Sequence, residues 1–176
     1  NSGLIYRYCS KLIIQKNPKN IIPFIKKKLK TVSYKSISKQ KLHSEKISYH
    51  VAFLAKDKRI RKIVNQFQMK IIRTNSKICV EGRDIASKIL AKNPKYDLAF
   101  YFKCNLEVAA KRRWMDLNRS VLLKDIKKSL KMRTLLDKKR KHSPLIKVKD
   151  AILIRTDLLS KKQVLSKMTK YIEKIR

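Results

Sequence analysis

Glycine and acidic side chains are scarce in this chain of 176 residues. Only two glycines occur, Gly3 and Gly82, so each is expected where the backbone approaches another group closely. No run of eighteen apolar residues is present, and we therefore expect no membrane span. The first residues lack the basic segment and apolar run of a secretory signal peptide, which favours a cytoplasmic protein. An apolar fraction of 43% is still enough to build a core.

Cysteine is also rare, and the three that occur, Cys9, Cys79 and Cys104, are scattered. Their number is odd, and two of them lie inside apolar, strand-like runs. We interpret all three as small buried residues in a reducing cytosol. The three histidines show no metal-ligand spacing and have no cysteine partners, so no metal site is predicted.

The chain has 12 acidic residues and 47 lysines and arginines, which gives a formal net charge of +35. One interpretation is nucleic-acid binding through counterion release. The other is compositional drift, because 35 of the 47 basic residues are lysines, spread along the chain beside many Ile and Asn with similarly A/T-rich codons. Drift is favoured, since extreme charge speaks to nonspecific binding rather than to a specific site. The 12 arginines are then informative, because lysine cannot form the bidentate hydrogen bonds that arginine makes with phosphate.

Apolar periodicity and capping residues predict a chain of helices interrupted by short strands. The predicted helices cover about 4–15, 21–30, 44–72, 105–118, 121–141 and 160–175. Asp57 can cap a second helix within 44–72, and 31–42 is predicted to be a loop or a short extended piece. The predicted buried strands are 77–80, 98–103 and 151–154. Strands that alternate with helices indicate an α/β fold with a parallel sheet, whose ligands bind beyond the carboxyl ends of the strands.

Two runs place a carboxylate beside guanidinium groups in a predicted loop or helix. Gly82-Arg83-Asp84 follows the strand at 77–80, and Arg133, Asp137 and Arg140 precede Ser143-Pro144-Leu145. Such groups suit a ligand that carries both phosphate and hydrogen-bond donors. The alternative for the second run is a solvated ion pair on one helix face, and for Asp84 a loop-end cap.

Further motifs lie in a fixed order around these runs: Asn1-Ser2-Gly3-x-x-Tyr6-Arg7 at the start, Arg112-Arg113 near a helix end, and Asp150-Ala151 before the last strand. The ordered set spans nearly the whole chain and resembles the bacterial cytidylate kinases, nucleoside-monophosphate kinases of the P-loop class. The resemblance implies a three-layer, P-loop kinase-like parallel sheet with flanking helices and a helical lid. It also implies one domain over 1–176, with a monophosphate-binding region at about 8–72 and a lid at about 119–145.

The resemblance implies roles for five residues in binding the nucleoside monophosphate. In the family, the residues at the positions of Ser2 and Arg7 contact the nucleoside monophosphate. The residue at the position of Arg61 is another arginine that binds its phosphate. The positions of Arg83 and Asp84 meet the cytosine and its phosphate or sugar surroundings.

Three more residues belong to the implied lid. The positions of Arg133 and Arg140 are catalytic, because they neutralise the transferring phosphoryl group. The position of Asp137 helps to bind the sugar. The implied reaction moves the γ-phosphate of ATP to CMP or dCMP, giving CDP or dCDP, with Mg²⁺ required by the chemistry but no ligand for it visible in the sequence. The implied protein is a monomer that binds neither a specific nucleic acid nor a membrane.

The chain departs from the family pattern in three ways. The family's opening strand and its Gly-x-x-x-x-Gly-Lys-Ser/Thr loop are absent, Asn1 replaces an aspartate, and a small β insert is reduced within 16–42. We therefore expect an amino-terminally truncated kinase that alone binds ATP poorly and turns over little. Two alternatives stay open, a basic RNA-binding protein of ribosomal type and a pseudo-kinase that retains only the monophosphate site.

Overall fold

The computed structural model describes residues 1–175, apart from the side chain of Glu45. It divides into two compact units, Asn1–Ile85 and Ala86–Arg176. The first unit is helical and the second contains the sheet. The single domain, monophosphate-binding region and lid expected from the sequence stay predictions.

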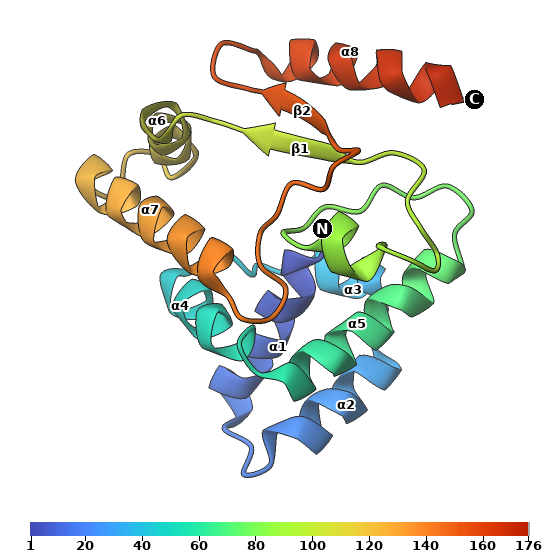
Figure 1. Cartoon of the computed structure of the whole chain (residues 1–176). Helices are drawn as coiled ribbons and strands as arrows, with labels where there is room; N and C mark the ends of the chain where they lie inside the picture. Colours follow the sequence, from blue (N-terminus) through green and yellow to red (C-terminus); the bar gives the residue numbers. More distant parts are fainter. Residues whose placement is uncertain (176) are drawn as a thin grey trace. The chain divides into compact units, whose positions relative to one another are not determined.

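Five helices make up the first unit (Figure 1). They are α1 (Gly3–Lys16), α2 (Ile21–Thr31), α3 (Tyr34–Ser38), α4 (Glu45–Leu54) and α5 (Lys58–Arg73). Helix α1 packs against α3 and α4, and α2 packs against α5. These five helices surround a cluster of buried apolar side chains.

Capping side chains explain where several of these helices begin. The Ser44 hydroxyl accepts from the Ile47 N–H at the start of α4. The Asp57 carboxylate accepts from the Arg59 N–H, so the long helical pattern is divided at Asp57, as its capping potential predicted. The prediction of a loop over 31–42 was wrong in part, because the Ser33 hydroxyl caps the short helix α3.

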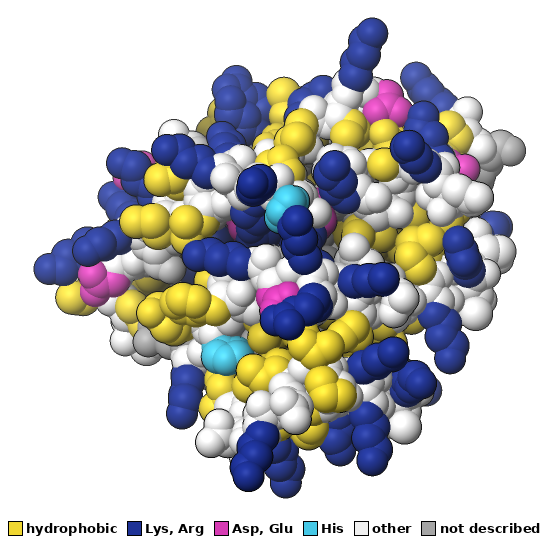
Figure 2. All heavy atoms as spheres, turned by 60° about the horizontal axis from the view of Figure 1, so that its bottom comes forward, with side chains coloured by type: hydrophobic (Ala, Val, Ile, Leu, Met, Phe, Trp, Pro, Cys, Tyr) yellow, Lys and Arg dark blue, Asp and Glu magenta, His cyan; other side chains and the backbone are white. Residues whose placement is uncertain are grey.

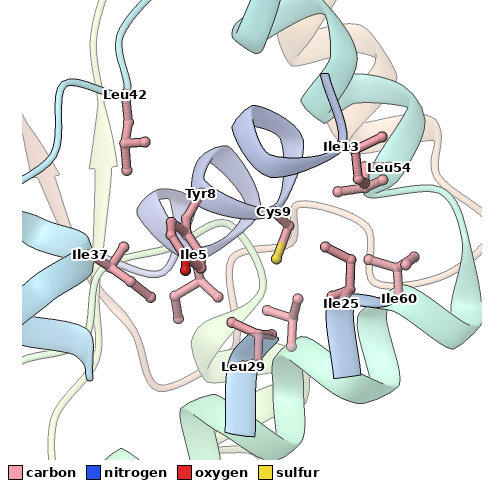
Figure 3. Close-up of a cluster of buried hydrophobic side chains, with 11 residues drawn as sticks. Ile5, Tyr8, Cys9, Ile13, Ile25, Leu29, Ile37, Leu42, Leu54 and Ile60 are labelled. Atoms are coloured by element: carbon pink, nitrogen blue, oxygen red, sulfur yellow. The ribbon is translucent and has the colours of Figure 1, made fainter. Parts of the chain in front are cut away.

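The core of the first unit lies between α1 and the helices around it. Figure 3 shows side chains from α1, among them Ile5 and Cys9, pointing toward Ile25 and Leu29 of α2 and Ile60 of α5. Each of these side chains is almost fully buried. Burial raises the pKa of the Cys9 thiol to about 12, because a thiolate would lose its hydration there.

The buried strand predicted over 77–80 was wrong. These residues form no strand, and Ile78 and Cys79 are exposed. An apolar run forms a strand only where another strand pairs with it. Within the described part of the chain, no strand pairs with residues 77–80. The burial predicted for the cysteines is therefore confirmed for Cys9 and wrong for Cys79, while Cys104 is partly exposed.

The second unit holds a parallel sheet of two strands (Figure 1). Its elements are the π-helical turn η1 (Ile85–Ile89, starting one residue before the unit), β1 (Phe100–Lys103), α6 (Leu106–Asp116), α7 (Leu123–Lys139), β2 (Ile152–Arg155), α8 (Lys161–Ile172) and the 3₁₀ turn η2 (Glu173–Ile175). The register runs from the pair Phe100 and Ile152 to the pair Lys103 and Arg155. The predicted α/β class with a parallel sheet is confirmed.

Helices cover and follow these strands. Asn105 caps α6 through the Glu107 N–H, and Ser160 and Gln163 form a capping box at the start of α8. The Phe100 ring of β1 meets the Tyr171 ring of α8 with centroids 6.2 Å apart. Helices α6 and α7 pack side by side. In residues 1–175, no helix combines the length and the apolar character needed to cross a membrane.

Candidate functional site

Arg61 and Asp84 form a buried ion pair in the first unit. Nη2 of Arg61 donates to Oδ2 of Asp84, and the two side chains are 8% and 11% exposed. Nη1 of Arg61 donates to the Ala55 carbonyl at 3.3 Å. The Tyr6 ring lies on another side of the guanidinium, with its centroid 6.0 Å away. Arg61 is thus held from three directions, in an orientation that a solvent-exposed arginine would not keep.

Ser2 lies directly beside the turn that carries Asp84. The Ser2 N–H donates to the Glu81 carbonyl at 2.9 Å. A Cβ atom on Gly82 would meet the Ser2 hydroxyl and come within 2.7 Å of the Ile85 side chain. The expectation that Gly82 serves a close approach is confirmed, since only a residue without a side chain fits there.

Arg7 and Arg83 complete the predicted residues of the first unit. Nη1 of Arg7 donates to the Leu42 carbonyl at 3.2 Å and to the Ser48 hydroxyl at 2.9 Å. Its guanidinium is thereby held against the segment that begins α4. Arg83 is partly exposed, between Gly82 and the buried Asp84. The structure therefore gathers Ser2, Arg61, Arg83 and Asp84 around one turn, whereas the bonds of Arg7 run to residues 42 and 48.

The second cluster lies at the end of α7 and belongs to the second unit. Asp137 is 1% exposed, and its Oδ1 accepts from Nη2 of Arg140. Nε of Arg133 lies 3.9 Å from Oδ2 of Asp137. The Asp137 carbonyl accepts from the Leu145 N–H at 2.8 Å, which ties the helix end to the following turn. The spacings of four and three residues bring all three side chains together, and a carboxylate this deeply buried is not part of a solvated face.

Sequence reasoning did not single out Tyr6 as a neighbour of Arg61. The only indication in the sequence was the place of Tyr6 beside Arg7 in the opening motif. It also did not foresee the contact of Tyr96 with Asp150, whose hydroxyl and carboxylate are 2.5 Å apart. That hydrogen bond raises the pKa of Tyr96 to about 12 and lowers the pKa of Asp150.

A shallow hollow of about 800 Å³ opens beside Tyr96 and Asp150. Apolar residues of the second unit, such as Ala91 and Val148, form much of its lining. None of the eight predicted site residues belongs to this lining. Hydrogen bonds and burial, rather than the hollow, therefore mark the two arginine–aspartate clusters as candidate sites, one in each unit.

The described residues offer no ready metal centre. Within residues 1–175, no three His, Cys, Asp or Glu side chains lie close enough together to hold a metal ion. The two clusters each hold a single carboxylate, already bonded to arginine, so their chemistry is the binding of anions and of hydrogen-bond donors.

Comparison with known proteins identifies one family over almost the whole chain. The sequence profile of the family described as cytidylate kinase matches residues 1–174. The cytidylate kinase of Rickettsia akari (strain Hartford) is 30% identical over 135 residues, which are 75% of this chain and 60% of that protein. The cytidylate kinase of Rickettsia canadensis (strain McKiel) is 29% identical over 138 residues, 77% of this chain and 62% of that protein.

The chain thus spans about three fifths of the length of the curated relatives that it matches. The family match covers both units and both arginine–aspartate clusters. The chain belongs to the cytidylate kinase family.

Proposed function

We propose that this chain serves the transfer of the γ-phosphate of ATP to CMP or dCMP, giving CDP or dCDP. The observation that carries the proposal is the buried pair of Arg61 and Asp84 beside Ser2. A monophosphate with an amino-substituted base needs both an anion-binding group and a fixed acceptor, and this turn supplies them together. The Rickettsia relatives are named cytidylate kinases, which supports the same substrate class.

In this proposal the first unit recognises the pyrimidine nucleotide. Arg61 and Arg83 bind its phosphate, and Asp84 accepts from the cytosine amino group or a sugar hydroxyl. Ser2 and Arg7 complete the contacts from α1. Oδ2 of Asp84 already accepts from Arg61, so the donor of the base would bond to the other carboxylate oxygen, and a base without that donor would lose this hydrogen bond.

The cluster at the end of α7 acts on the phosphoryl group. Phosphoryl transfer needs little covalent chemistry, and catalysis comes from positioning and from neutralising charge on the moving group. Arg133 and Arg140 supply that positive charge, and Asp137 binds the sugar while it orients both guanidiniums. Of the two, Arg133 is more exposed, at 55% against 21% for Arg140, and is therefore better placed to turn toward a ligand.

Magnesium accompanies ATP in such chemistry and would neutralise part of the charge on its phosphates. The side chains described here offer it no set of carboxylate ligands. The monomeric state and the cytoplasmic location expected from the sequence stay predictions.

The RNA-binding alternative rests only on charge. Figure 2 shows Lys and Arg side chains spread over the visible face between apolar and neutral ones, without a single basic stripe. A dedicated nucleic-acid surface usually gathers its basic residues on one face or along one helix. A salt titration separates the alternatives, because RNA affinity should fall steeply with salt whatever the RNA sequence.

The decisive test is CMP binding by calorimetry with Asp84→Asn, using Asp57→Asn as the matched control. Asp57 is a helix cap near the surface, so its loss removes the same charge without touching the candidate site. Asp84→Asn is expected to weaken CMP binding by about tenfold or more, the cost of losing one charged hydrogen bond. Equal weakening by both variants would refute the proposed site and leave only nonspecific attraction.

Turnover by the 176 residues alone is expected to be slow. They contain no Gly-x-x-x-x-Gly-Lys-Ser/Thr run, whose backbone amides and lysine hold the donor phosphates in this class. The measurement is ADP formed from ATP in the presence and absence of CMP. Rapid CMP-dependent ADP formation would contradict this expectation, although it would support the assigned reaction.

A further inference from the structure

The Arg7 side chain, which extends from α1, is tied to two acceptors near the start of α4. Its Nη1 lies 3.2 Å from the Leu42 carbonyl oxygen and 2.9 Å from the Ser48 hydroxyl oxygen. Nη1 carries two hydrogens, so each acceptor can take one of them. Two bonds fix the position of the guanidinium, whereas it could rotate about a single one.

Both acceptors are themselves held in place. The Leu42 side chain is 0% exposed and belongs to the apolar core of the first unit, which anchors its backbone. The Ser48 hydroxyl donates to the Ser44 carbonyl at 2.8 Å, one helical turn earlier. Because the single hydroxyl hydrogen of Ser48 is used in that bond, its oxygen acts as an acceptor toward Arg7.

The Ser48 hydroxyl brings no advantage to α4 itself. Serine has a lower helix propensity than alanine, and a hydroxyl that bonds back to the carbonyl four residues earlier slightly destabilises a helix. Ser48 is also exposed, so its side chain fills no space in the core. What the hydroxyl provides, and alanine would not, is the bond to Arg7.

Gln40 offers a matched comparison within the same unit. Lys11 follows Arg7 by one turn of α1, and its Nζ donates to Oε1 of Gln40 at 3.2 Å. Gln40 and Ser48 thus each accept from a cation of α1, and neither carries a charge. Only Ser48 is bonded to a residue that is assigned to CMP.

We propose that Ser48 is a positioning residue that holds the Arg7 guanidinium in place for the phosphate of CMP. This role rests on the proposed function, in which Arg7 is one of the contacts of CMP. Phosphate is the anionic part of CMP and therefore the part that a guanidinium binds. An arginine that is already fixed loses less conformational entropy when the ligand arrives. Ser48 thus raises the affinity for the phosphate without touching the ligand.

The test compares CMP with cytidine, which has the same base and sugar but no phosphate. Dissociation constants are measured for the ¹⁵N-labelled full chain from the NMR shifts of the amides of 82–84, at moderate salt that screens nonspecific attraction to the net charge of +35. Ser48→Ala is expected to weaken CMP binding about threefold to tenfold, the usual cost of one hydrogen bond. Cytidine binding is expected to stay unchanged, and Gln40→Ala should alter neither.

Three further measurements separate positioning from a structural role. Ser48→Thr is expected to keep the CMP affinity of the unchanged chain, because a threonine hydroxyl in a helix can bond to the same carbonyl four residues earlier. In an Arg7→Met chain, Ser48→Ala is expected to cost nothing more, since the group that Ser48 positions is gone. Urea denaturation should find Ser48→Ala at least as stable as the unchanged chain.

Unchanged CMP affinity in Ser48→Ala, while Arg7→Met still weakens it, would overturn the role of Ser48 and leave the proposed CMP site standing. Equal weakening of CMP and cytidine would also overturn it, as would a Ser48→Thr variant as weak as Ser48→Ala or a further loss in the Arg7→Met chain. A chain in which CMP shifts no amide of 82–84 would contradict the proposed function, and with it the role of Ser48.

Discussion

The guanidinium of Arg61 and the carboxylate of Asp84 are paired in the interior of the first unit, although 23 residues separate them in the chain. Each charge has been taken out of water, and each is compensated by the other. Such a pair contributes little net stability, but it leaves an uncompensated buried charge when either partner is removed. The pair therefore links the proposed recognition of CMP to folding.

Arg61→Met is expected to lower the free energy of unfolding by about 3–5 kcal/mol, because the Asp84 carboxylate would stay buried without its partner. Urea denaturation measures this change. Arg59→Met is the control, since Arg59 pairs with Asp57 at the surface, with its own side chain 74% exposed, and should cost about 1 kcal/mol or less. Similar losses in the two variants would show that the Arg61 pair is not buried in solution.

Gly82→Ala is expected to destabilise the fold by about 1–3 kcal/mol, the usual cost of overpacking a filled site. The added methyl group would displace the Ser2 hydroxyl and the Ile85 side chain. Gly3→Ala is the matched control, because its methyl group would meet only the Asn1 side chain, at 3.1 Å, within a helix. That variant is expected to gain stability by up to about 1 kcal/mol from the higher helix propensity of alanine. A neutral Gly82→Ala in thermal denaturation would mean that Ser2 does not lie against the turn.

Cys79 is expected to react with iodoacetamide at pH 8, whereas Cys9 is not. Cys79 is exposed, while Cys9 is fully buried with a thiol pKa of about 12. Mass spectrometry of the alkylated chain distinguishes the two sites, and Cys9 should become reactive only in denaturant. Equal labelling of both cysteines in the native chain would contradict the packing of α1.

The raised pKa of Cys9 also makes the free energy of unfolding depend on pH in the alkaline range. The folded state disfavours the thiolate. The stability that the buried, neutral Cys9 thiol contributes is therefore fully present below the ordinary thiol pKa of 9.0 and is lost as the pH rises toward 12. Cys9→Ala is expected to flatten the fall in unfolding free energy between these values. Parallel curves for the two proteins in alkaline urea titrations would argue against this assignment.

Asp157 gives the folding stability the opposite pH dependence, in the acid range. The Asn105 N–H, its main partner, lowers the pKa of this carboxyl group. The stability that it contributes is present above the ordinary carboxyl pKa of about 3.9 and is lost as the pH falls through the lowered value. Asp157→Asn should remove this part of the acid transition, and exchange of the Asn105 amide followed by NMR checks it. An Asn105 amide that exchanges equally in both proteins at neutral pH would count against the bond.

Local chemistry explains which parts of the fold were predictable from the sequence. Asp57 was expected to cap a helix and does so, and Asn105 and Ser160 cap the helices predicted over 105–118 and 160–175. A cap is predictable because it needs only its own backbone neighbours. The ion pairs of Asp137 with Arg133 and Arg140 follow from helical spacing in the same way.

The features that the sequence did not predict depend on contacts between residues far apart in the chain. The segment 77–80 has the composition of a buried strand, but it forms no strand and residues 77–79 are exposed, because strand formation depends on a partner that composition does not reveal. The bond between Arg61 and Asp84 joins a helix to a distant turn, so both residues were foreseen as ligand contacts but not as partners of each other. Arg112 was expected as part of a family motif, but not its hydrogen bonds to the Thr156 and Leu159 carbonyls, which lie 44 and 47 residues further along the chain.

The two units differ in what fills their interiors. The first closes over a cluster of large side chains from α1, α2 and α5, whereas half of the buried apolar residues described in the second are alanines, beside Leu90, Ile126 and Ile154. A sheet of only two strands adds little cohesion of its own. Under limited trypsin digestion, the second unit should therefore be cut first, and a helical fragment near residues 1–85 should outlast it.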